Sequence, residues 1–400
     1  MHETAYVWHL SSEPMKKVFL ILLILLQATG NICRSQEPVR NSADTFRISG
    51  QLSAWGNYNH GNSLPVITGG RYIPSLYLGT GTAGNKLIDL EASGNVFGTF
   101  AFNPFNRSSA TGNLKPYRLW ARYSDDQLEI RLGLQKINFG SASMLRPLMW
   151  FDQMDPRDPL NLTDGVWALL ARYYFLNNAN IWIWGLYGNV ERRGWELIPS
   201  NNRIPEFGGR LQVPVPHGEA AISYHYRNAD NREMILFSNY HEKIPEDRFG
   251  FDARWDLKTG LWIEGSWTRK RMDLGTLTNQ EILNAGIDYT FGIGNGLYLV
   301  YEHLLVSYDQ KAFEFANRTS FSLLRLNYPV GLFDNAGALV YYDWTNSNVY
   351  TFVTWQKQFD NVMFYIMGYA NPSGYNLPAQ TGSNNYYSGK GIQLMIVFNH

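Results

Sequence analysis

Hydrophobic and polar residues alternate one by one along much of this chain. In the segment 127–135 the apolar positions are Leu128, Ile130, Leu132 and Leu134. A period of two sorts the side chains of an extended strand onto two faces, so this segment predicts a strand with one apolar and one polar face. Similar patterns predict eighteen strands in all, at about 46–54, 86–93, 95–103, 116–124, 127–136, 166–174, 180–187, 207–213, 219–227, 247–257, 260–270, 281–291, 296–306, 319–328, 335–343, 348–358, 361–369 and 391–398.

The connections between these segments are alternately short and long. The short ones, rich in turn-forming residues, lie at 93–95, 124–126, 177–180, 214–218, 257–260, 292–296, 329–335 and 358–361. The opposite set contains the long connections 55–85, 104–115, 136–165, 188–206, 228–246, 271–280, 307–318 and 371–390, together with the brief 344–348. Residues 234–240 also alternate, but counting them as a strand would put the two sets out of phase, so they are interpreted as part of a loop.

An even number of strands with short turns at one end and long loops at the other is typical of outer-membrane β-barrels. A periplasmic or secreted β-sandwich or propeller is the alternative, since alternation does not say whether the apolar face meets lipid or a core. Three features favour the barrel: a last strand that ends on the aromatic Phe398, aromatic residues near strand ends such as Trp120 with Tyr123, and closure, which leaves no unpaired backbone in lipid. We expect an all-β, antiparallel transmembrane barrel of eighteen strands, with sixteen as the alternative count, short periplasmic turns and long extracellular loops.

The N-terminus predicts export. Met15, Lys16 and Lys17 precede an apolar stretch from Val18 to Leu26 and then polar and small residues up to Ser35. This is the layout of a secretory signal peptide, with cleavage after Ser35 and residues 1–14 as an upstream extension. Cleavage there would remove the one cysteine, Cys33. A lipoprotein anchored through Cys33 is the alternative.

The predicted domains are therefore the extension and signal peptide at 1–35, a flexible segment at 36–45 and a single barrel at 46–400. An exported chain without disulfides and rich in strands indicates the outer membrane of a Gram-negative bacterium. Its expected partners are outer-membrane lipid and, through the strand that ends at Phe398, the barrel-assembly machinery.

Composition narrows the function. The 400 residues carry a formal net charge of zero, with 17% charged residues, 15% aromatic residues and 36 glycines. A neutral chain lacks the excess of basic charge that a nucleic-acid partner requires. No stretch of the mature chain approaches the roughly 20 apolar residues of a membrane-spanning helix. No cofactor and no metal site are predicted.

A forty-residue segment resembles a known family. The sequence RLGLQKINFG at 131–140 is followed by a loop with Asp-Pro pairs and by Asp164-Gly165-Val166. This arrangement resembles the central segment of bacterial outer-membrane porin-like proteins related to the alginate-export type, in which a strand of the form RxGRQxxxxG leads to a loop and a DGV-type return strand. Leu134 stands where the second basic residue of that pattern is expected. The resemblance implies an eighteen-stranded channel and does not imply alginate.

Charged residues on the polar faces of the predicted strands are candidates for lining a pore. The basic ones are Arg118, Arg122, Arg131, Arg210, Arg254 and Arg325, and the acidic ones are Glu129, Asp252, Asp256 and Asp288. Such charges set ion and solute selectivity in a channel. The alternative for each residue is a charge pair across neighbouring strands that only satisfies its partner.

The connection 136–165 is the candidate constriction. Its segment 145–150 is too apolar for an exposed tip, which predicts a loop folded into the lumen. The candidate residues are Met144, Arg146, Trp150, Asp152, Asp155 and Asp158. The acidic ones, with Asp164, have the oxygen ligands that Ca²⁺ prefers, but Asp-Pro pairs also build turns, and the turn interpretation is favoured.

The predicted function is passive diffusion of small hydrophilic solutes, without catalysis. A plugged barrel with a structural, assembly or surface-anchoring role is the alternative. An outer-membrane hydrolase is the third hypothesis, because the strands contain His225 and His303, although neither lies in a catalytic motif.

Overall fold

The computed structural model describes residues 45–82, 85–103, 107–232, 241–373 and 387–400. In these residues eighteen strands form one sheet: β1 (Thr45–His60), β2 (Val66–Thr82), β3 (Lys86–Asn103), β4 (Arg107–Ser124), β5 (Leu128–Gln135), β6 (Val166–Tyr174), β7 (Asn180–Leu186), β8 (Glu206–Val215), β9 (Gly218–Ala229), β10 (Ile244–Asp256), β11 (Gly260–Lys270), β12 (Asn279–Phe291), β13 (Leu297–Asp309), β14 (Arg318–Pro329), β15 (Asp334–Asp343), β16 (Asn348–Gln358), β17 (Val362–Ala370) and β18 (Lys390–Asn399). A short 3-10 helix, η1 (Gly275–Leu277), precedes β12.

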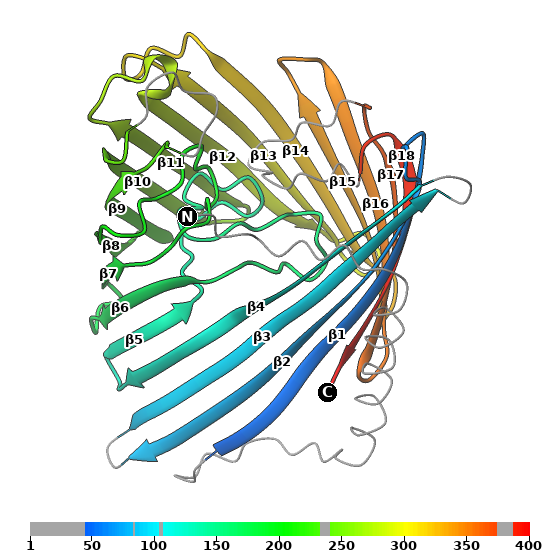
Figure 1. Ribbon diagram of the computed structural model, residues 1–400, viewed down its shortest axis with the longest axis horizontal. Helices are drawn as coiled ribbons and strands as arrows, with labels where there is room; N and C mark the ends of the chain where they lie inside the picture. Colours follow the sequence, from blue (N-terminus) through cyan, green and yellow to red (C-terminus); the bar gives the residue numbers. More distant parts are fainter. Residues whose placement is uncertain (1–44, 83–84, 104–106, 233–240, 374–386) are drawn as a thin grey trace.

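The sheet closes on itself. Each strand pairs antiparallel with its neighbours along the chain, and β1 also pairs with β18, with Leu52 opposite Phe398 and Tyr58 opposite Ile392. Figure 1 shows the resulting barrel, in which the chain between β5 and β6 and the chain between β7 and β8 lie inside the wall. The predicted all-β barrel and its strand number are confirmed, and closure removes the sheet edges that would otherwise expose unpaired backbone.

The two ends of the barrel differ. Short connections at 125–127, 175–179, 216–217, 257–259, 292–296, 330–333 and 359–361 lie at the end where β1 begins and β18 finishes, here called the turn end. The opposite end, here called the loop end, contains the connections 136–165, 187–205 and 271–278. The 61–65 connection at the loop end is short, so the predicted long loop at 55–85 is wrong.

The first strands differ from those predicted, although the total is the same. Residues 66–82 form β2 inside the predicted loop, whereas the predicted strands 86–93 and 95–103 are one strand, β3. The predicted long loop 104–115 is also wrong, since β4 begins at 107. The misleading sequence was Ser93-Gly94-Asn95, which forms a bulge within β3 rather than a turn.

Proline and glycine residues explain why this part of the sheet resembles loops in the sequence. Pro116 of β4 is the register partner of Gly94, and Pro74 of β2 lies in the gap that the β2–β3 pairing leaves beside it. Prolines lack the N–H that a strand interior needs, and a bulge is one of the places where a sheet tolerates them. The same Gly and Pro residues give the sequence the appearance of loops.

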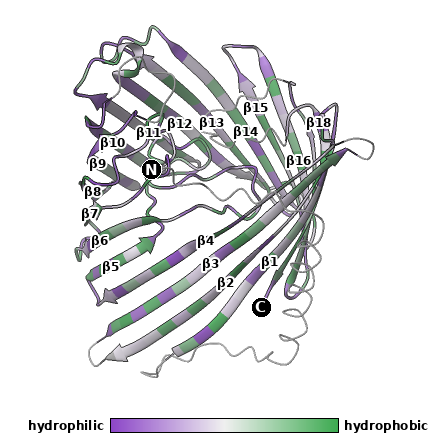
Figure 2. Ribbon diagram, in the orientation of Figure 1, coloured by the Kyte–Doolittle hydropathy of each residue, from purple (hydrophilic) through white to green (hydrophobic). Residues whose placement is uncertain are grey.

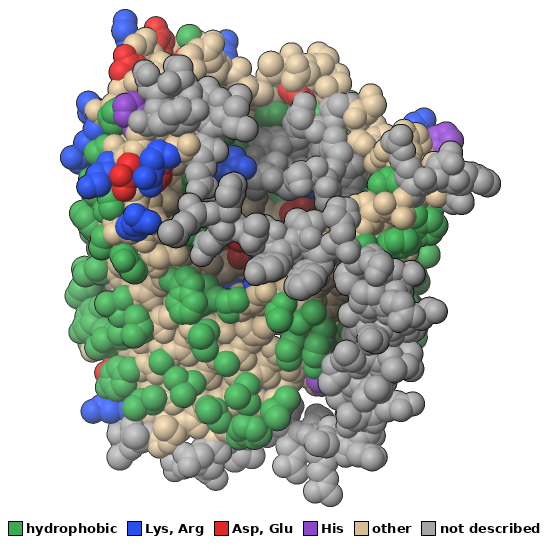
Figure 3. All heavy atoms as spheres, in the orientation of Figure 1, with side chains coloured by type: hydrophobic (Ala, Val, Ile, Leu, Met, Phe, Trp, Pro, Cys, Tyr) green, Lys and Arg blue, Asp and Glu red, His purple; other side chains and the backbone are tan. Residues whose placement is uncertain are grey.

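The apolar face of the strands points outward. Leu132 is 61% exposed and Ile396 is 47% exposed, whereas inward-facing polar residues such as Gln135 and Glu302 are fully buried. Figure 2 shows the alternation along β1–β4, and Figure 3 shows apolar side chains spread over the outer wall. No helix in the described part of the chain is long and apolar enough to cross a membrane. The predicted leader 1–35 and the loop interpretation of 234–240 fall outside the described residues, as does the predicted flexible segment 36–45 except for Thr45, the first residue of β1.

Candidate functional site

The loop 136–165, here called the inner loop, packs against the inside of the barrel. The side chains of Phe139, Leu148, Trp150 and Phe151 are buried in one cluster with inward-facing residues of β6 and β7, namely Val166, Ala168, Leu170, Trp184 and Leu186. Phe139 stacks on Trp184 with ring centroids 5.5 Å apart. The apolar segment that is unsuited to an exposed tip is therefore accommodated by an apolar patch on the inner wall.

Two carboxylates on β11 and β13 hold the inner loop through its backbone. Glu264 of β11 accepts hydrogen bonds from the backbone nitrogens of Ala142 at 2.8 Å and Leu148 at 2.7 Å. Glu302 of β13 accepts them from Ser143 at 2.7 Å and Leu145 at 2.6 Å. Both carboxylates are buried. These backbone donors satisfy the buried carboxyl oxygens and fix the position of the loop.

The two glycines of segment 131–140, which resembles the porin-like family, have structural roles. Gly133 has φ +123° and Gly140 has φ +111°, conformations that residues with a Cβ rarely adopt. A Cβ on Gly133 would meet the backbone carbonyl of Leu119, and one on Gly140 would meet the carboxylate of Glu264. The two glycines therefore allow the chain to leave β5 and pass close to its anchor.

The inner loop also has an internal ion pair. Arg146 donates to Asp152 at 2.7 Å and to the backbone oxygen of Phe139 at 2.9 Å, and both charged side chains are buried. Burial opposes the charge of Arg146, but the nearby carboxylates of Asp152 and Glu264 outweigh it and raise the pKa of the guanidinium. Trp150 completes the anchoring by donating its indole N–H to Ser266 of β11 at 2.9 Å.

In the second half of the inner loop, aspartate side chains stabilise local turns. Asp155 accepts the backbone N–H of Arg157, and Asp158 accepts those of Leu160 and Leu162. Burial raises the pKa of Asp158, with these hydrogen bonds and the charge of Arg71 on β2 opposing the rise. The carboxylates serve local turns. In the described part of the chain no group of three or more potential ligands is gathered around a metal position.

Arginines line the inner face of β4–β6. Arg122 bonds Asp89 of β3 at 2.6 Å, and the carboxylate of Glu129 on β5 is approached by Arg131 at 3.1 Å and Arg172 at 3.5 Å. Arg131 lies 4.6 Å from the ring centroid of Trp120, and Arg172 lies 3.8 Å from that of Trp182. Aromatic faces thus hold these partly exposed guanidiniums against the wall.

Arg118 also points into the barrel, but it contacts the inner loop. It is buried, lies 3.9 Å from the ring centroid of Tyr117 and donates to the backbone oxygen of Thr163 at 2.8 Å. It therefore holds the end of the inner loop where the chain returns to β6.

The other predicted lining residues form a buried pair, a group of three charges and a single arginine. Arg210 and Asp252 are a buried pair at 2.5 Å, and Asp252 also accepts the hydroxyl of Ser141. Nearer the turn end, Arg254 pairs with Asp256 at 3.0 Å and with Asp288 at 2.9 Å. Arg325 of β14 lies 3.6 Å from the sulfur of Met144. The candidates are thus divided among loop anchors, buried pairs and partly exposed wall charges.

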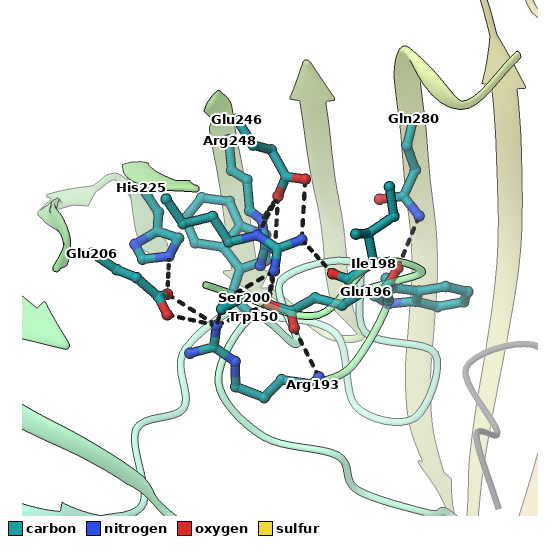
Figure 4. A network of polar contacts seen from close by, with 12 residues as sticks. Trp150, Arg193, Glu196, Ile198, Ser200, Glu206, His225, Glu246, Arg248 and Gln280 are labelled. Carbon is teal, nitrogen blue, oxygen red and sulfur yellow. Dashed lines mark hydrogen bonds and ion pairs between the residues drawn. The ribbon is translucent and has the colours of Figure 1, made fainter. Parts of the chain in front are cut away.

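A second loop, residues 187–205, is held by a buried ionic network that the sequence analysis did not identify. Glu196 lies 3.0 Å from Arg193, 3.3 Å from Arg227 and 2.8 Å from Arg248. Figure 4 shows Arg193 and Glu196 of the loop together with Glu246 and Arg248 of β10. Burial would raise the pKa of Glu196, but the three guanidiniums outweigh burial and lower it.

The other two acids of this network, Glu206 and Glu246, also contact basic residues. Arg193 lies 2.9 Å from Glu206, which in turn contacts His225, and Arg227 lies 2.6 Å from Glu246. The two loops meet where Trp195 donates to the backbone oxygen of Arg146 at 2.8 Å. The inner loop and the 187–205 loop therefore form one packed unit.

Part of the interior is apolar. Buried residues on the inner faces of β12–β17 join Leu145 of the inner loop in one cluster, comprising Ile282, Leu304, Val306, Phe321, Leu323, Leu339, Tyr341, Tyr350, Phe352, Met367 and Tyr369. Tyr387, just before β18, packs on Phe352 and Tyr369 and lies 4.8 Å from the guanidinium carbon of Arg157. The inner loop thus reaches from the β11–β13 wall to the chain that enters β18.

The two strand histidines lie on opposite faces of the wall. His225 points inward and is fully buried between Glu206 and Trp184. His303 lies on the outer face, where its ring nitrogens contact the hydroxyls of Ser322 at 2.9 Å and Ser320 at 3.1 Å. Within the described residues no carboxylate is bonded to His303, so a Ser-His-acid arrangement is not assembled there.

The fold is similar to that of solved bacterial outer-membrane porins. Pseudomonas aeruginosa OpdQ matches with a TM-score of 0.54 and 12% identity, covering 89% of this chain and 97% of that one. Acinetobacter baumannii OccAB4 matches with a TM-score of 0.53 and 11% identity, covering 91% and 100%. P. aeruginosa OccK5 (OpdH) matches with a TM-score of 0.52 and 12% identity, covering 88% and 97%. No family model and no curated protein matches the sequence.

These similarities establish a porin-type barrel as the fold, at identities too low to carry a substrate. The narrower resemblance to alginate-export proteins stays a prediction.

Proposed function

We propose that this protein is a channel of the Gram-negative outer membrane through which small hydrophilic solutes diffuse passively. The observation that carries the proposal is the anchoring of the inner loop across the inside of a porin-type barrel by Glu264 and Glu302. A loop fixed in this way narrows the passage through the barrel and leaves the rest of it open. No covalent chemistry is required, since solutes move down their own gradients past fixed charges.

Solutes pass between the inner loop and the strands β1–β6 in this proposal. The inward-facing cations on the described part of these strands are Arg47, Arg71, Lys115, Arg118, Arg122, Arg131 and Arg172, and the inward-facing acids are Asp89, Glu91 and Glu129. Cations outnumber acids on this wall. The inner loop contributes Asp155, paired with Arg157 at 2.6 Å, and Asp158 to the other side of the passage, so solutes meet charges of both signs there.

Nearer the turn end, the predicted lining charges that remain are Arg254, Asp256, Asp288 and Arg325. The apolar outer face and the closed sheet support residence in a lipid bilayer. The last strand presents Ile392, Leu394, Ile396 and Phe398 outward, as expected for a strand that the barrel-assembly machinery engages.

Planar-bilayer conductance tests the proposal. The refolded protein should give discrete, stable conductance steps, and reversal potentials in a salt gradient should report the sign of the selectivity. Protein that is folded as a barrel but passes no current would contradict the channel.

A plugged barrel is the second candidate. It is favoured by the apolar interior of β12–β17 and by the contact between Arg157 and Tyr387, because apolar surface facing a water-filled lumen is unfavourable. A barrel without conductance that gains it when Arg157 and Tyr387 are both replaced by alanine would support this alternative.

A further inference from the structure

A hollow of about 770 Å³ lies on the outer wall at β7–β12. Its apolar lining includes Ile222, Phe249, Phe251 and Leu283 from the strands, and Phe313 and Phe315 from the connection before β14. Ile222 is 63% exposed and Phe249 is 45% exposed. A hollow of this size is within the range of about 300–1,000 Å³ found for small-molecule sites.

Register places the hollow within three tiers on the outer face. Leu211, Ile222, Phe251 and Leu283 belong to an apolar tier in which Ile222 is opposite both Leu211 and Phe251. Tyr224, Phe249 and Trp267 form the next tier towards the loop end, with ring centroids 5.3 Å apart in each neighbouring pair. A mainly aliphatic tier below an aromatic row is the arrangement expected where the acyl chains of a bilayer meet its headgroups.

The third tier is charged. Asp247 and Arg269 are opposite each other in register, two positions beyond Phe249 and Trp267 and therefore on the same face of the sheet. Arg271 bonds Asp247 at 2.7 Å and lies 5.3 Å from the ring centroid of Tyr226. Arg269 is exposed, and no hydrogen bond or ion pair of its guanidinium is found within the described part of the chain. Because Asp247 is paired with Arg271, the guanidinium of Arg269 is the charge in this tier that is left for an anionic ligand, and Glu281, the acid in the lining of the hollow, is engaged by the backbone of Phe313.

The rings of the 310–317 connection form one side of the hollow. The backbone nitrogen of Phe313 donates to Glu281 at 3.0 Å, and its ring centroid lies 5.0 Å from that of Trp267. Phe313 and Phe315 both have positive φ, at 58° and 52°, conformations that are unusual for aromatic residues. Strained residues that carry apolar rings on the outer face indicate a site shaped for an apolar ligand.

We propose that this hollow binds one phosphorylated glycolipid of the outer leaflet, of the lipid A type. This inference rests on the proposed membrane location. An acyl chain occupies the hollow, and a phosphate contacts the guanidinium of Arg269 by charge-assisted hydrogen bonds. Arg269, which lies beside the paired Asp247 and Arg271, supplies the complementary charge for an anionic headgroup.

The test is native mass spectrometry of the refolded protein in detergent micelles, titrated separately with lipid A, phosphatidylglycerol and phosphatidylcholine. We expect one tightly bound lipid A per barrel and weaker binding of the other two. Arg269→Gln should weaken lipid A roughly tenfold, as expected for loss of one charge-assisted contact. Arg318→Gln, a matched change of another exposed arginine at the loop end, should leave the affinity unchanged.

A second pair of variants tests the hollow itself. Ile222→Trp fills it from an exposed position and should abolish the single tight site, whereas Ile392→Trp on the outer face of β18 should not. Equal affinity for all three lipids, or wild-type binding by both Arg269→Gln and Ile222→Trp, would overturn the proposal, as would a second copy of the chain bound instead of lipid. A folded barrel that binds lipid A but conducts nothing would leave this inference standing and contradict only the channel.

Discussion

The carboxylate of Glu264 on β11 lies 2.7 Å from the backbone nitrogen of Leu148, a residue that precedes it by 116 positions. The second oxygen of the same carboxylate accepts the backbone N–H of Ala142. A single strand residue therefore fixes two points of the inner loop. In a fold whose strands contact only their neighbours, such contacts determine the shape of the interior.

Replacing this anchor should loosen the loop without opening the barrel. In Glu264→Gln one of the two backbone N–H groups faces an amide that cannot accept from it, and we expect a loss of about 1–3 kcal/mol in the free energy of unfolding. Conductance should become noisier, and the inner loop should become sensitive to protease. Glu191→Gln, at an exposed loop position, is the control. A variant with wild-type stability and quiet conductance would show that Glu264 does not hold the loop.

Gly140 should be intolerant of a side chain. Gly140→Ala combines a positive φ with a Cβ that meets the Glu264 carboxylate, whereas Gly188→Ala has a positive φ and open space around the Cβ. Backbone strain alone costs about 1–2 kcal/mol. We therefore expect Gly188→Ala to lose about that amount and Gly140→Ala to lose about 2–4 kcal/mol, with displacement of the loop anchor. Denaturant unfolding in lipid vesicles measures both, and equal losses would contradict the role of the clash.

The alternation of apolar and polar residues was sufficient to predict the barrel, because each strand has one face towards lipid and one towards the interior. It was insufficient for β2, where Gly69, Gly70 and Pro74 interrupt the apolar pattern. In the structure Pro74 lies beside the bulge at Gly94. The pairing of β2 with β3 determines that geometry, and the sequence of one strand alone does not reveal it.

The inner loop was predicted from its apolar segment, but its anchors were not. Glu264 and Glu302 are acids on the inner faces of predicted strands, and nothing in their local sequence distinguishes them from Asp288 nearer the turn end. The network around Glu196 unites one loop with four strands, β8–β11. Its members lie up to 77 positions apart, from Arg193 to Lys270, and only the closed sheet brings them together.

The 187–205 loop should be sensitive to acid. The pKa of Glu196 is lowered from its ordinary 4.5, so its stabilisation is fully present above that pH and is lost as the pH falls through the folded-state value. Glu196→Gln leaves three buried guanidiniums without this partner and should cost about 3 kcal/mol at neutral pH. The difference from the wild-type protein should shrink steadily below pH 4.5. A difference that is constant between neutral and acidic pH would show that the ionised carboxylate is not responsible.

Charge selectivity should depend on the arginines on the inner face of β4–β6. If solutes pass along β4–β6, the surplus of cations there favours anions, and reversal potentials in a KCl gradient should show anion preference. Arg131→Gln removes a partly exposed guanidinium held over Trp120, and we expect the anion-to-cation permeability ratio to fall by less than roughly fivefold, the size of about 1 kcal/mol for a solvated charge. Lys258→Gln, at an exposed position in a turn, is the control for a general loss of charge. An unchanged ratio in Arg131→Gln, or the same change in both variants, would place the selective passage elsewhere in the barrel.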